Sequence, residues 1–551
     1  MLPGRNSSNL LSNPILQYSS IAGSLLLVFL FVFFQSEDNP LLPQFQIDSE
    51  VYKYCGRSIL DGNKPYIDYF DHKGPLIHFS NALALKVSNT WGVLVFDFFF
   101  LTSVLLLALF SLKQGGRLLM VALFFILISQ SYEGGNFTEI IGLPLLMFSF
   151  TFLSNNLVNF KSFSLISNRN ALSMGLVFSS ICFLIFNKLT YAFPIFSFFL
   201  VDVIFEKNKK RWLVLIEGVL YLSVFLFVFC LLYILIYGIH SFLGFLDASI
   251  LFNLIYASGS GGVTYSNLFF DSFVGLIYRP HYWFFLFFIA CKFILFFGNR
   301  DKEFVRKLLV FWLLFYLFTL FTIILGKRGY GHYDLMLLPS LLALLMFWDT
   351  LMPSKRFRLY FSIVFGLILL FSFQRVSKSV LQSYWRWGAS IQNLPNFVSE
   401  NARKSSSVTD WTTKLNSQAP DFPAVTVCKN MCRIYTVLDK RSSSRYFYPV
   451  TKLNGELLLP DYYKEVGEKL IVGEVLILES GNSHIRLDSI QARMPRNLIP
   501  IYLFSEQVYG TQLDFYQVKE EGSFGQTLSK IGFPISTGLQ FSRKDFRPTD
   551  L

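Results

Sequence analysis

Long apolar stretches separated by short polar turns fill the first two thirds of the chain. These stretches are residues 15–34, 92–112, 118–130, 139–153, 171–186, 191–205, 212–237, 282–297, 308–325, 335–348 and 359–373. A helix needs roughly 20 residues to cross a bilayer, so the shorter stretches must extend into their flanks unless two of them are re-entrant. The pattern predicts an α-helical polytopic membrane domain, residues 1–374, with about eleven transmembrane helices.

The charges lie around these stretches and predict an orientation. About fifteen basic residues fall in alternate short turns, and they are Lys113, Arg117, Lys161, Arg169, Lys207, Lys209, Lys210, Arg211, Arg300, Lys302, Arg306, Lys307, Lys355, Arg356 and Arg358. By the positive-inside rule these turns are cytoplasmic, so the N-terminus lies inside and everything after residue 374 outside. The net charge of +12 is therefore explained by basic residues in the cytoplasmic turns and does not indicate nucleic-acid binding. Stretch 15–34 lacks a small-residue cleavage site after it and is interpreted as a retained helix.

Composition supports the membrane assignment. The chain has 53% hydrophobic and 15% charged residues and a mean hydropathy of +0.46, which is too apolar for a soluble protein. Lipid is therefore the expected solvent for most of it.

The first outward loop, residues 36–91, has a pattern of its own. Apolar residues recur at helical spacing through 51–60, Asp61-Gly62-Asn63 breaks this helix, and a second amphipathic stretch follows Pro75. We expect two short helices lying along the membrane surface. Another long outward segment, 238–281, contains the glycine-rich run 259–262, which is predicted to be a mobile loop over the substrate cavity.

The tail, residues 375–551, has ordinary polarity and is predicted to be a small extracytoplasmic α/β domain. The β-rich runs 424–428, 433–438 and 475–478 are predicted to be strands. Cys428 and Cys432 lie four residues apart without a second cysteine pair, which leaves a structural disulfide open and argues against a zinc site. The cysteines in or beside the apolar stretches, Cys55 among them, are interpreted as small apolar side chains.

Residues able to carry chemistry concentrate in the first outward loop. They are Asp48, Glu50, Arg57, Asp61, Asp68, Asp71, His72 and Lys73. A carboxylate can take the proton from a hydroxyl, and a lysine or arginine can offset the charge of a phosphate. The loop therefore has the groups for transfer from a phosphate-linked donor to a hydroxyl. A solvated, salt-bridged surface loop is the alternative interpretation.

The same loop resembles a known family. Between Asp48 and Pro75 the chain runs Asp-x-x-Val-Tyr, Gly-Arg-x-Ile-Leu-x-Gly, Pro-Tyr-x-Asp and Asp-His-Lys-Gly-Pro. This run resembles the first external loop of bacterial GT-C glycosyltransferases, the polytopic enzymes related to protein O-mannosyltransferases and to the lipid A aminoarabinose transferase. Glu133-Gly-Gly-Asn-Phe-Thr-Glu139 and Arg328-Gly-Tyr-Gly-His-Tyr333, followed by Pro339, extend the resemblance. It covers these motifs and the whole topology, including the outward C-terminal domain.

The resemblance implies a GT-C fold in a bacterial plasma membrane and an inverting transfer of one sugar. The donor would be a polyprenyl-phosphate-linked hexose or pentose, and the acceptor a hydroxyl of an envelope glycan or glycolipid on the outer face. Polyprenyl phosphate is a good leaving group, whereas a hydroxyl is a weak nucleophile. This chemistry therefore needs a base more than it needs an acid.

Four residues acquire implied roles from their places in the first motif. Asp48 matches the catalytic base, and its alternative is an N-cap for a helix starting at Ser49. Arg57 and Lys73 match cations near the donor phosphate, with snorkelling to lipid headgroups as the alternative for Lys73. Asp71 matches an acid that orients the acceptor or the base, and a turn-forming aspartate is its alternative.

The other motifs extend the implied site. Arg328, His332 and Tyr333 match groups that hold the lipid phosphate, or they anchor the chain at the membrane interface. Lys188, a lone outward cation in an apolar hairpin, is interpreted as an interface anchor in preference to a phosphate contact. Glu139 matches an acid on the acceptor side of the cavity, or it stabilises the N-terminus of its helix.

Glu50 is also assigned to the acceptor side, although the sequence departs from the family here. Asp48-Ser-Glu50 stands where relatives have an adjacent Asp-Glu pair. Asp48 and Glu50 could hold magnesium or manganese, but no spacing demands a metal. We therefore assign no metal ligand and no required cofactor.

A lipid-linked glycan transporter or flippase, or a non-catalytic assembly subunit, is the competing function. A transporter places ionisable residues at mid-membrane on several helices. Here the apolar stretches are almost free of charge and the ionisable groups gather at one interface. This distribution favours an interfacial enzyme.

Overall fold

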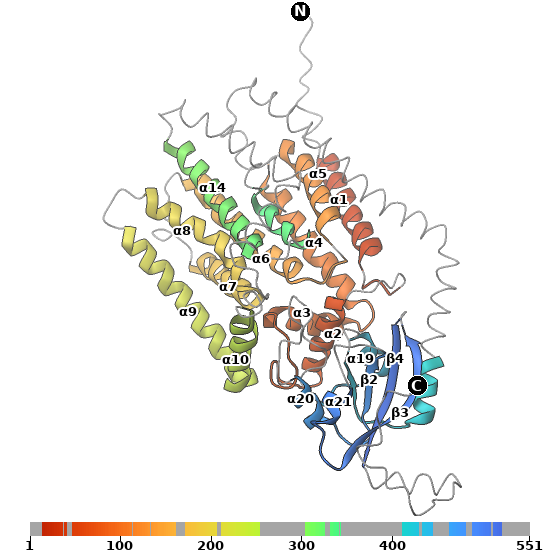
Figure 1. Ribbon diagram of the computed structural model, residues 1–551. Coiled ribbons are helices and arrows are strands. Elements are labelled where there is room, and N and C mark those ends of the chain that lie inside the picture. Colours follow the sequence, from red (N-terminus) through yellow and green to blue (C-terminus); the bar gives the residue numbers. More distant parts are fainter. Residues whose placement is uncertain are drawn as a thin grey trace, which may run out of the picture. The chain divides into compact units, whose positions relative to one another are not determined.

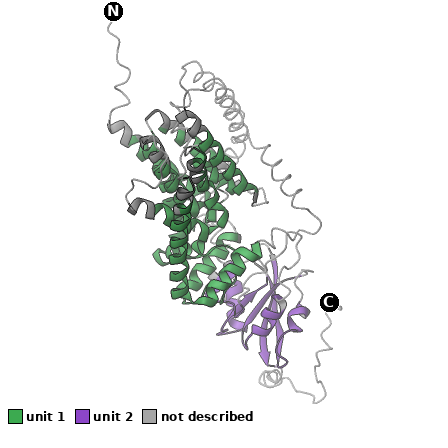
Figure 2. Cartoon of the chain, turned by 90° about the vertical axis from the view of Figure 1, so that its left-hand side faces the viewer, with its two compact units in different colours: residues 1–401 green, residues 402–551 purple. Residues whose placement is uncertain are grey.

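The computed structural model describes two compact units, one within residues 1–401 and the other within 402–551 (Figure 2). The described residues are 14–36, 38–40, 47–112, 114–132, 134–160, 171–205, 211–253, 303–325, 331–340, 342, 410–428, 432–444, 462–480, 487–508 and 511–520. Several predicted features lie outside them, namely the spans 282–297 and 359–373, most of the span 335–348, the glycine-rich run 259–262, Glu133 and Arg328.

The first unit is helical (Figure 1). Its helices are α1 (Pro14–Gln35), α2 (Ile47–Leu60), α3 (Pro75–Val87), α4 (Gly92–Ser111), α5 (Gln114–Ser131), α6 (Thr138–Phe160), α7 (Ala171–Asn187), α8 (Phe193–Phe205), α9 (Arg211–Tyr237), α10 (Ile239–Leu246) and α14 (Glu303–Leu325). Shorter turns are η1 (Leu189–Ala192), the π-helical η2 (Asp247–Leu251) and η3 (Gly331–Leu337). Helix α6 packs against both α4 and α7, and α8 packs against α14.

Two described helical segments are long and apolar enough to cross a bilayer, Gly92–Ser111 and Gly218–Tyr237. Five shorter apolar segments are Ile21–Gln35, Thr138–Leu153, Leu176–Asn187, Ile239–Leu251 and Val310–Ile324. Gly218–Tyr237 is only 6% buried, against 44% for Gly92–Ser111, so α9 has the surface expected of a helix that faces lipid. The number of transmembrane helices stays a prediction, because the predicted spans 282–297 and 359–373 and most of 335–348 lie outside the described residues.

Both helices predicted in the first loop are present as α2 and α3, and they pack against each other. A Cβ at Gly56 of α2 would come within 2.6 Å of the Ala82 nitrogen of α3, so only glycine permits this approach. At the start of α3, a Cβ at Gly74 would collide with the carbonyl oxygen of Asn187 at the end of α7. The first contact holds α2 against α3, and the second places the start of α3 against the end of α7.

The second unit contains a four-stranded sheet in the order β1-β2-β4-β3. Its elements are β1 (Val425–Val427), α19 (Arg433–Leu438), α20 (Tyr462–Lys469), β2 (Val475–Glu479), α21 (Leu487–Gln491), β3 (Leu498–Val508) and β4 (Thr511–Glu520). Strands β1 and β2 are parallel, whereas β4 runs antiparallel to β2 and to β3. The hairpin of β3 and β4 contains an irregularity between Tyr502 and Phe504.

Two of the predicted strands are present as β1 and β2, but the prediction for 433–438 is wrong. Arg433–Leu438 forms helix α19. A parallel pair such as β1 and β2 needs a crossover connection, and α19 lies in that crossover, so topology overrides the local β-propensity. Cys428 and Cys432 are buried thiols and not a disulfide, and burial raises the pKa of Cys428 to about 12.

Candidate functional site

The first turn of α2 carries the residue implied to be the base. Because α2 begins at Ile47, Asp48 lies inside the helix and is not the N-cap of a helix starting at Ser49. Asp48 is exposed. Within the described part of the chain, its carboxylate accepts no hydrogen bond and forms no ion pair. An anion in the first turn of a helix lies at the positive end of the helix dipole, which is favourable for the Asp48 carboxylate.

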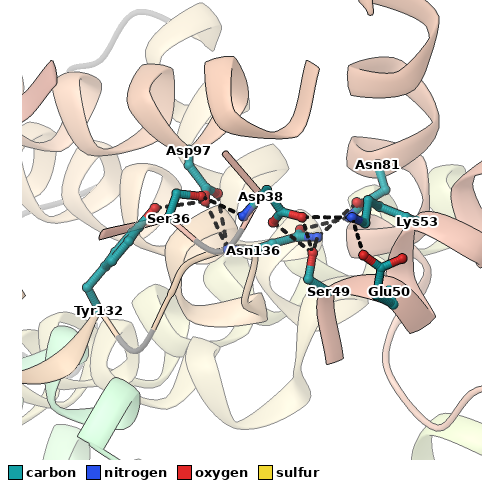
Figure 3. A network of polar contacts seen from close by, with 9 residues as sticks. All are labelled: Ser36, Asp38, Ser49, Glu50, Lys53, Asn81, Asp97, Tyr132 and Asn136. Carbon is teal, nitrogen blue, oxygen red and sulfur yellow. Dashed lines mark hydrogen bonds and ion pairs between the residues drawn. The ribbon is translucent and has the colours of Figure 1, made fainter. Parts of the chain in front are cut away.

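The next residue, Ser49, belongs to a buried polar network (Figure 3). The α2 network consists of Ser36, Asp38, Ser49, Glu50, Lys53, Asn81, Asp97, Tyr132 and Asn136. The Ser49 hydroxyl donates to the Asp38 carboxylate at 2.7 Å and accepts from Nδ2 of Asn136 at 2.8 Å. The side-chain amides of Asn136 and Asn81 exchange two hydrogen bonds, of 2.9 and 3.0 Å. The first turn of α2 is thereby tied to α3 and to the connection between α5 and α6, which contains Asn136.

Asp97, in the first third of α4, holds the other end of the network. It accepts the backbone N–H of Asn136 at 3.0 Å and the Tyr132 hydroxyl at 3.0 Å, and it is 2% exposed. The turn between these residues has positive φ at Gly135 (91°) and at Asn136 (52°). A Cβ at Gly135 would collide with the Asp97 carboxylate, so glycine permits this close turn.

Lys53 lies one turn after Ser49 and forms an ion pair with Glu50 but not with Asp48. Its ammonium is 3.0 Å from Asp38 and 2.6 Å from Glu50. Burial lowers the pKa of Lys53, but the two carboxylates outweigh burial and hold it above its usual value. Glu50 is therefore committed to an ion pair, whereas Asp48 is not.

Three predicted site residues influence the pKa of His72. Burial lowers the pKa of His72 and the charge of Lys73 lowers it further, while Asp71 and Asp48 act in the opposite direction. Of the three, Asp71 contacts the imidazole, with its Oδ1 3.4 Å from Nδ1 of His72. Lys73 is the next residue in the chain, and Asp48 acts on the imidazole through its charge.

The turn that carries Lys73 is held by its backbone. The hydroxyls of Tyr66 and Ser249 each donate to the Lys73 carbonyl at 2.7 Å. Asn253 donates to the His72 carbonyl at 2.7 Å. The Lys73 side chain is partly exposed, so a fixed backbone presents a cation that can still reach a ligand.

Asp71 is buried and paired. It is 1% exposed, its Oδ2 lies 2.8 Å from Nε2 of His78, and its Oδ1 accepts the His72 backbone N–H at 2.8 Å. Burial raises the pKa of Asp71, but the hydrogen bonds and charges of the two histidines outweigh it and hold the pKa well below its usual range. A carboxylate this deep cannot contact an acceptor, so of its two implied roles only orientation of the base region fits.

A second group of polar residues surrounds Glu139, the second residue of α6. The Glu139 cluster consists of Glu139, Lys188, Tyr191, His332 and Tyr333. The Glu139 carboxylate is 3.4 Å from the Lys188 ammonium and 3.9 Å from Nε2 of His332, and it accepts the Tyr191 hydroxyl. Lys188 also lies over the Tyr333 ring at 4.1 Å. Sequence reasoning treated Lys188 as an anchor, whereas the fold makes it the partner of Glu139.

No protein-family model matches the sequence, and no curated protein matches it. Among solved structures, the chain is similar to the crystal structure of ArnT from Cupriavidus metallidurans bound to undecaprenyl phosphate. The identity is 10%, the TM-score 0.44, and the match covers 91% of this chain and 98% of that one. It is also similar to the Archaeoglobus fulgidus oligosaccharyltransferase in complex with zinc and sulfate, at 14% identity and a TM-score of 0.43, over 83% of this chain and 68% of that one.

Both TM-scores are below 0.5. The identities are very low. The roles of individual side chains therefore have to come from their own geometry.

The predicted site residues fall into two groups and one outlier. Asp48, Glu50, Asp71 and Lys73 share the first loop, and Glu139, His332 and Tyr333 share the Glu139 cluster. Arg57 lies nine residues after Asp48 in the same helix, which separates the two by about 13 Å along α2. Their side chains are not brought together.

Sequence reasoning missed most of the α2 network. Asp97 carried a usable signal, because a lone carboxylate in an apolar stretch is costly and usually has a specific partner. Asn136 lay inside a quoted motif, but its role depends on contacts with Ser49 and Asn81, which lie 87 and 55 residues away. No local pattern reports such contacts.

Proposed function

We propose that this chain is a membrane glycosyltransferase that transfers a single sugar, with inversion, from a polyprenyl-phosphate donor to a hydroxyl of an envelope glycan or glycolipid. Transfer takes place on the non-cytoplasmic side of the bacterial plasma membrane. The observation that carries the proposal is the contrast within one helical turn: Asp48 is exposed and unpaired within the described chain, while Glu50 is held by Lys53.

Asp48 acts as the base. Its carboxylate takes the proton of the acceptor hydroxyl as the oxygen forms a bond to the anomeric carbon. The bond from that carbon to the phosphate oxygen breaks on the opposite face, and the lipid phosphate leaves with the electron pair. Attack and departure on opposite faces invert the configuration, and one carboxylate suffices because the leaving group is already stable.

The leaving phosphate needs positive charge on the other side of the sugar. Lys73 supplies it from the first loop and Lys188 supplies it from the Glu139 cluster. His332 and Tyr333 of that cluster can donate hydrogen bonds to the phosphate. Arg57 and Arg328 are the remaining cations assigned to the donor. Glu50 stays assigned to the acceptor side. Glu139 was also expected there, but it is as buried as Asp71 and lies 3.4 Å from the Lys188 ammonium, so here it fixes that cation for the phosphate.

A divalent metal at the pair Asp48 and Glu50 does not fit this arrangement. The Lys53 ammonium, 2.6 Å from Glu50, already supplies the positive charge that a metal would bring to that carboxylate. We therefore assign no step of the transfer to a metal at this pair.

The test is sugar transfer by purified protein from a panel of synthetic undecaprenyl-phosphate sugars to envelope glycan. Asp48→Asn should lower turnover by roughly 100- to 10,000-fold while donor binding and melting temperature stay unchanged. Asp61→Asn is the matched control and should keep full activity, because Asp61 is exposed and lies directly after the end of α2.

Full activity of Asp48→Asn would remove Asp48 as the base. Absence of transfer from every donor, with equal lipid-sugar binding by wild type and variant, would instead favour the transporter or assembly-subunit function.

A further inference from the structure

One buried cluster of the first loop contains every donor type that a zinc site uses. Cys55 comes from α2, Asp71 from the connecting loop and His78 from α3, and their ligand atoms all lie within 4.8 Å of one another. None of the three is more than 1% exposed. We propose that Cys55, Asp71 and His78 bind a zinc ion that fixes the first loop.

The donor set selects the metal. Thiolate, imidazole and carboxylate together suit zinc, whereas magnesium and calcium take oxygen ligands almost throughout. Three protein ligands leave one tetrahedral position for the second carboxylate oxygen or a water molecule.

The charge balance fits a divalent ion in a buried place. A thiolate and a carboxylate each carry one negative charge, and a neutral imidazole carries none, so a bound Zn²⁺ makes the site neutral. Neutrality matters here because an uncompensated charge at this depth is costly.

The geometry needs only a small adjustment. Donor atoms around a tetrahedral zinc ion lie about 3.3–3.6 Å apart. Oδ2 of Asp71 and Nε2 of His78, now 2.8 Å apart, would separate by about half an ångström. The pairs that include the Cys55 sulfur lie within 4.8 Å, so they would close by at most about 1.3 Å.

Outer contacts already orient two of the ligands. The Tyr69 hydroxyl lies 3.4 Å from Nδ1 of His78, which turns Nε2 toward Asp71. The His72 backbone N–H holds the other Asp71 oxygen at 2.8 Å. Such hydrogen bonds to the non-ligating atoms are typical of built metal sites.

The site would join the three parts of the first loop. Cys55 lies beside Gly56, where α2 and α3 touch, and Asp71 opens the turn that carries Lys73. A zinc ion would therefore hold α2, the turn and α3 in register without taking part in sugar transfer. The proposal stands whether or not the chain is a glycosyltransferase.

The test is metal content, measured by mass spectrometry on full-length protein purified without chelator and with a tag that lacks histidine. Wild type should hold about one zinc ion per chain. Cys55→Ser and His78→Gln should each retain less than about a tenth of it. Cys182→Ser, a buried thiol of α7, and His240→Gln, an exposed histidine of α10, are the matched controls and should retain all of it.

A second measurement covers variants that fail to fold. Wild type loaded with cobalt should develop a thiolate-to-cobalt charge-transfer band, which Cys182→Ser keeps. Zinc-free wild type that also gives no cobalt band, or a band that survives Cys55→Ser, would overturn the site and leave a hydrogen-bonded aspartate–histidine pair beside a thiol.

Discussion

The α2 network and the Glu139 cluster are built from similar side chains, but carboxylates are in excess in the first, whereas carboxylate and ammonium balance in the second. The α2 network has three carboxylates, Asp38, Glu50 and Asp97, and one ammonium, Lys53. The Glu139 cluster has one carboxylate, one ammonium and one imidazole. A phosphate is favoured beside the second and a proton-accepting carboxylate is kept beside the first. The difference suggests a division of labour, with the hydroxyl activated at α2 and the phosphate held at Glu139.

The largest loss of stability is expected from removing Lys53, the cation within the α2 network. Lys53→Met leaves Asp38 and Glu50 buried beside each other without a counter-charge, so the free energy of unfolding should fall by roughly 3 kcal/mol. Thermal unfolding in detergent measures it. Lys86→Met, on the exposed side of α3, is the control and should melt with wild type. Unchanged melting of Lys53→Met would mean that the network does not depend on this charge.

A smaller loss is expected from Asn136, whose hydrogen bonds connect the network. Asn136→Ala removes the bonds to Ser49 and Asn81 and places alanine at a φ of 52°. Together these should cost about 1–3 kcal/mol and lower kcat by displacing the first turn of α2.

Asn136→Gly separates the two causes, because glycine adopts positive φ freely. If the glycine variant melts with wild type, the side-chain bonds contribute nothing. Asn89→Ala, at an exposed asparagine after α3, controls for the loss of an amide.

Lys188 sharpens the comparison from the other side. Lys188→Met removes the ammonium of the Glu139 cluster, so KM for the undecaprenyl-phosphate sugar should rise about 10-fold. The melting temperature should also fall, though less than for Lys53→Met, because buried Glu139 loses a counter-charge at 3.4 Å. Steady-state kinetics with varied donor measure KM, and Lys86→Met again serves as the control. A fall in kcat at constant KM would move Lys188 from donor binding to the chemical step.

Much of the helical architecture could be predicted because lipid-facing and core helices need continuous apolar stretches, and the chain shows them directly. The bounds of α4 and α9 differ from the predicted 92–112 and 212–237 by a single residue. Local patterning also predicted α2 and α3, because Asp61-Gly62-Asn63 marks the end of α2 and Pro75 marks the start of α3.

The site was less predictable, because its key contacts are not local. Lys188 and Glu139 lie 49 residues apart in sequence, and neither signals the other. The same limit applies to 433–438, where β-branched and aromatic residues suggested a strand and the crossover between β1 and β2 required a helix. The residue types in the sequence indicated where chemistry could occur. Which charged groups are paired depends on the packing of the fold and could not be predicted.

The smallest effect on stability is expected from Glu474 in the second unit. Like the carboxylates of the α2 network it is buried, but its side-chain partners are hydroxyl groups and not a cation. Thr426 and Ser443 each donate to it at 2.7 Å. Burial raises the pKa of Glu474 above 4.5, although these hydrogen bonds oppose the shift.

The folded state therefore binds this proton more tightly than the unfolded chain does. Stability from Glu474 is complete below pH 4.5 and declines as pH rises through the higher folded pKa. Glu474→Gln should lose this decline. The melting temperature of the variant, relative to that of wild type, should therefore rise between pH 5 and 8. Glu465→Gln on α20 is the control. Parallel pH profiles for wild type and variant would contradict the raised pKa, because they would mean that Glu474 has the same pKa in the folded and unfolded states.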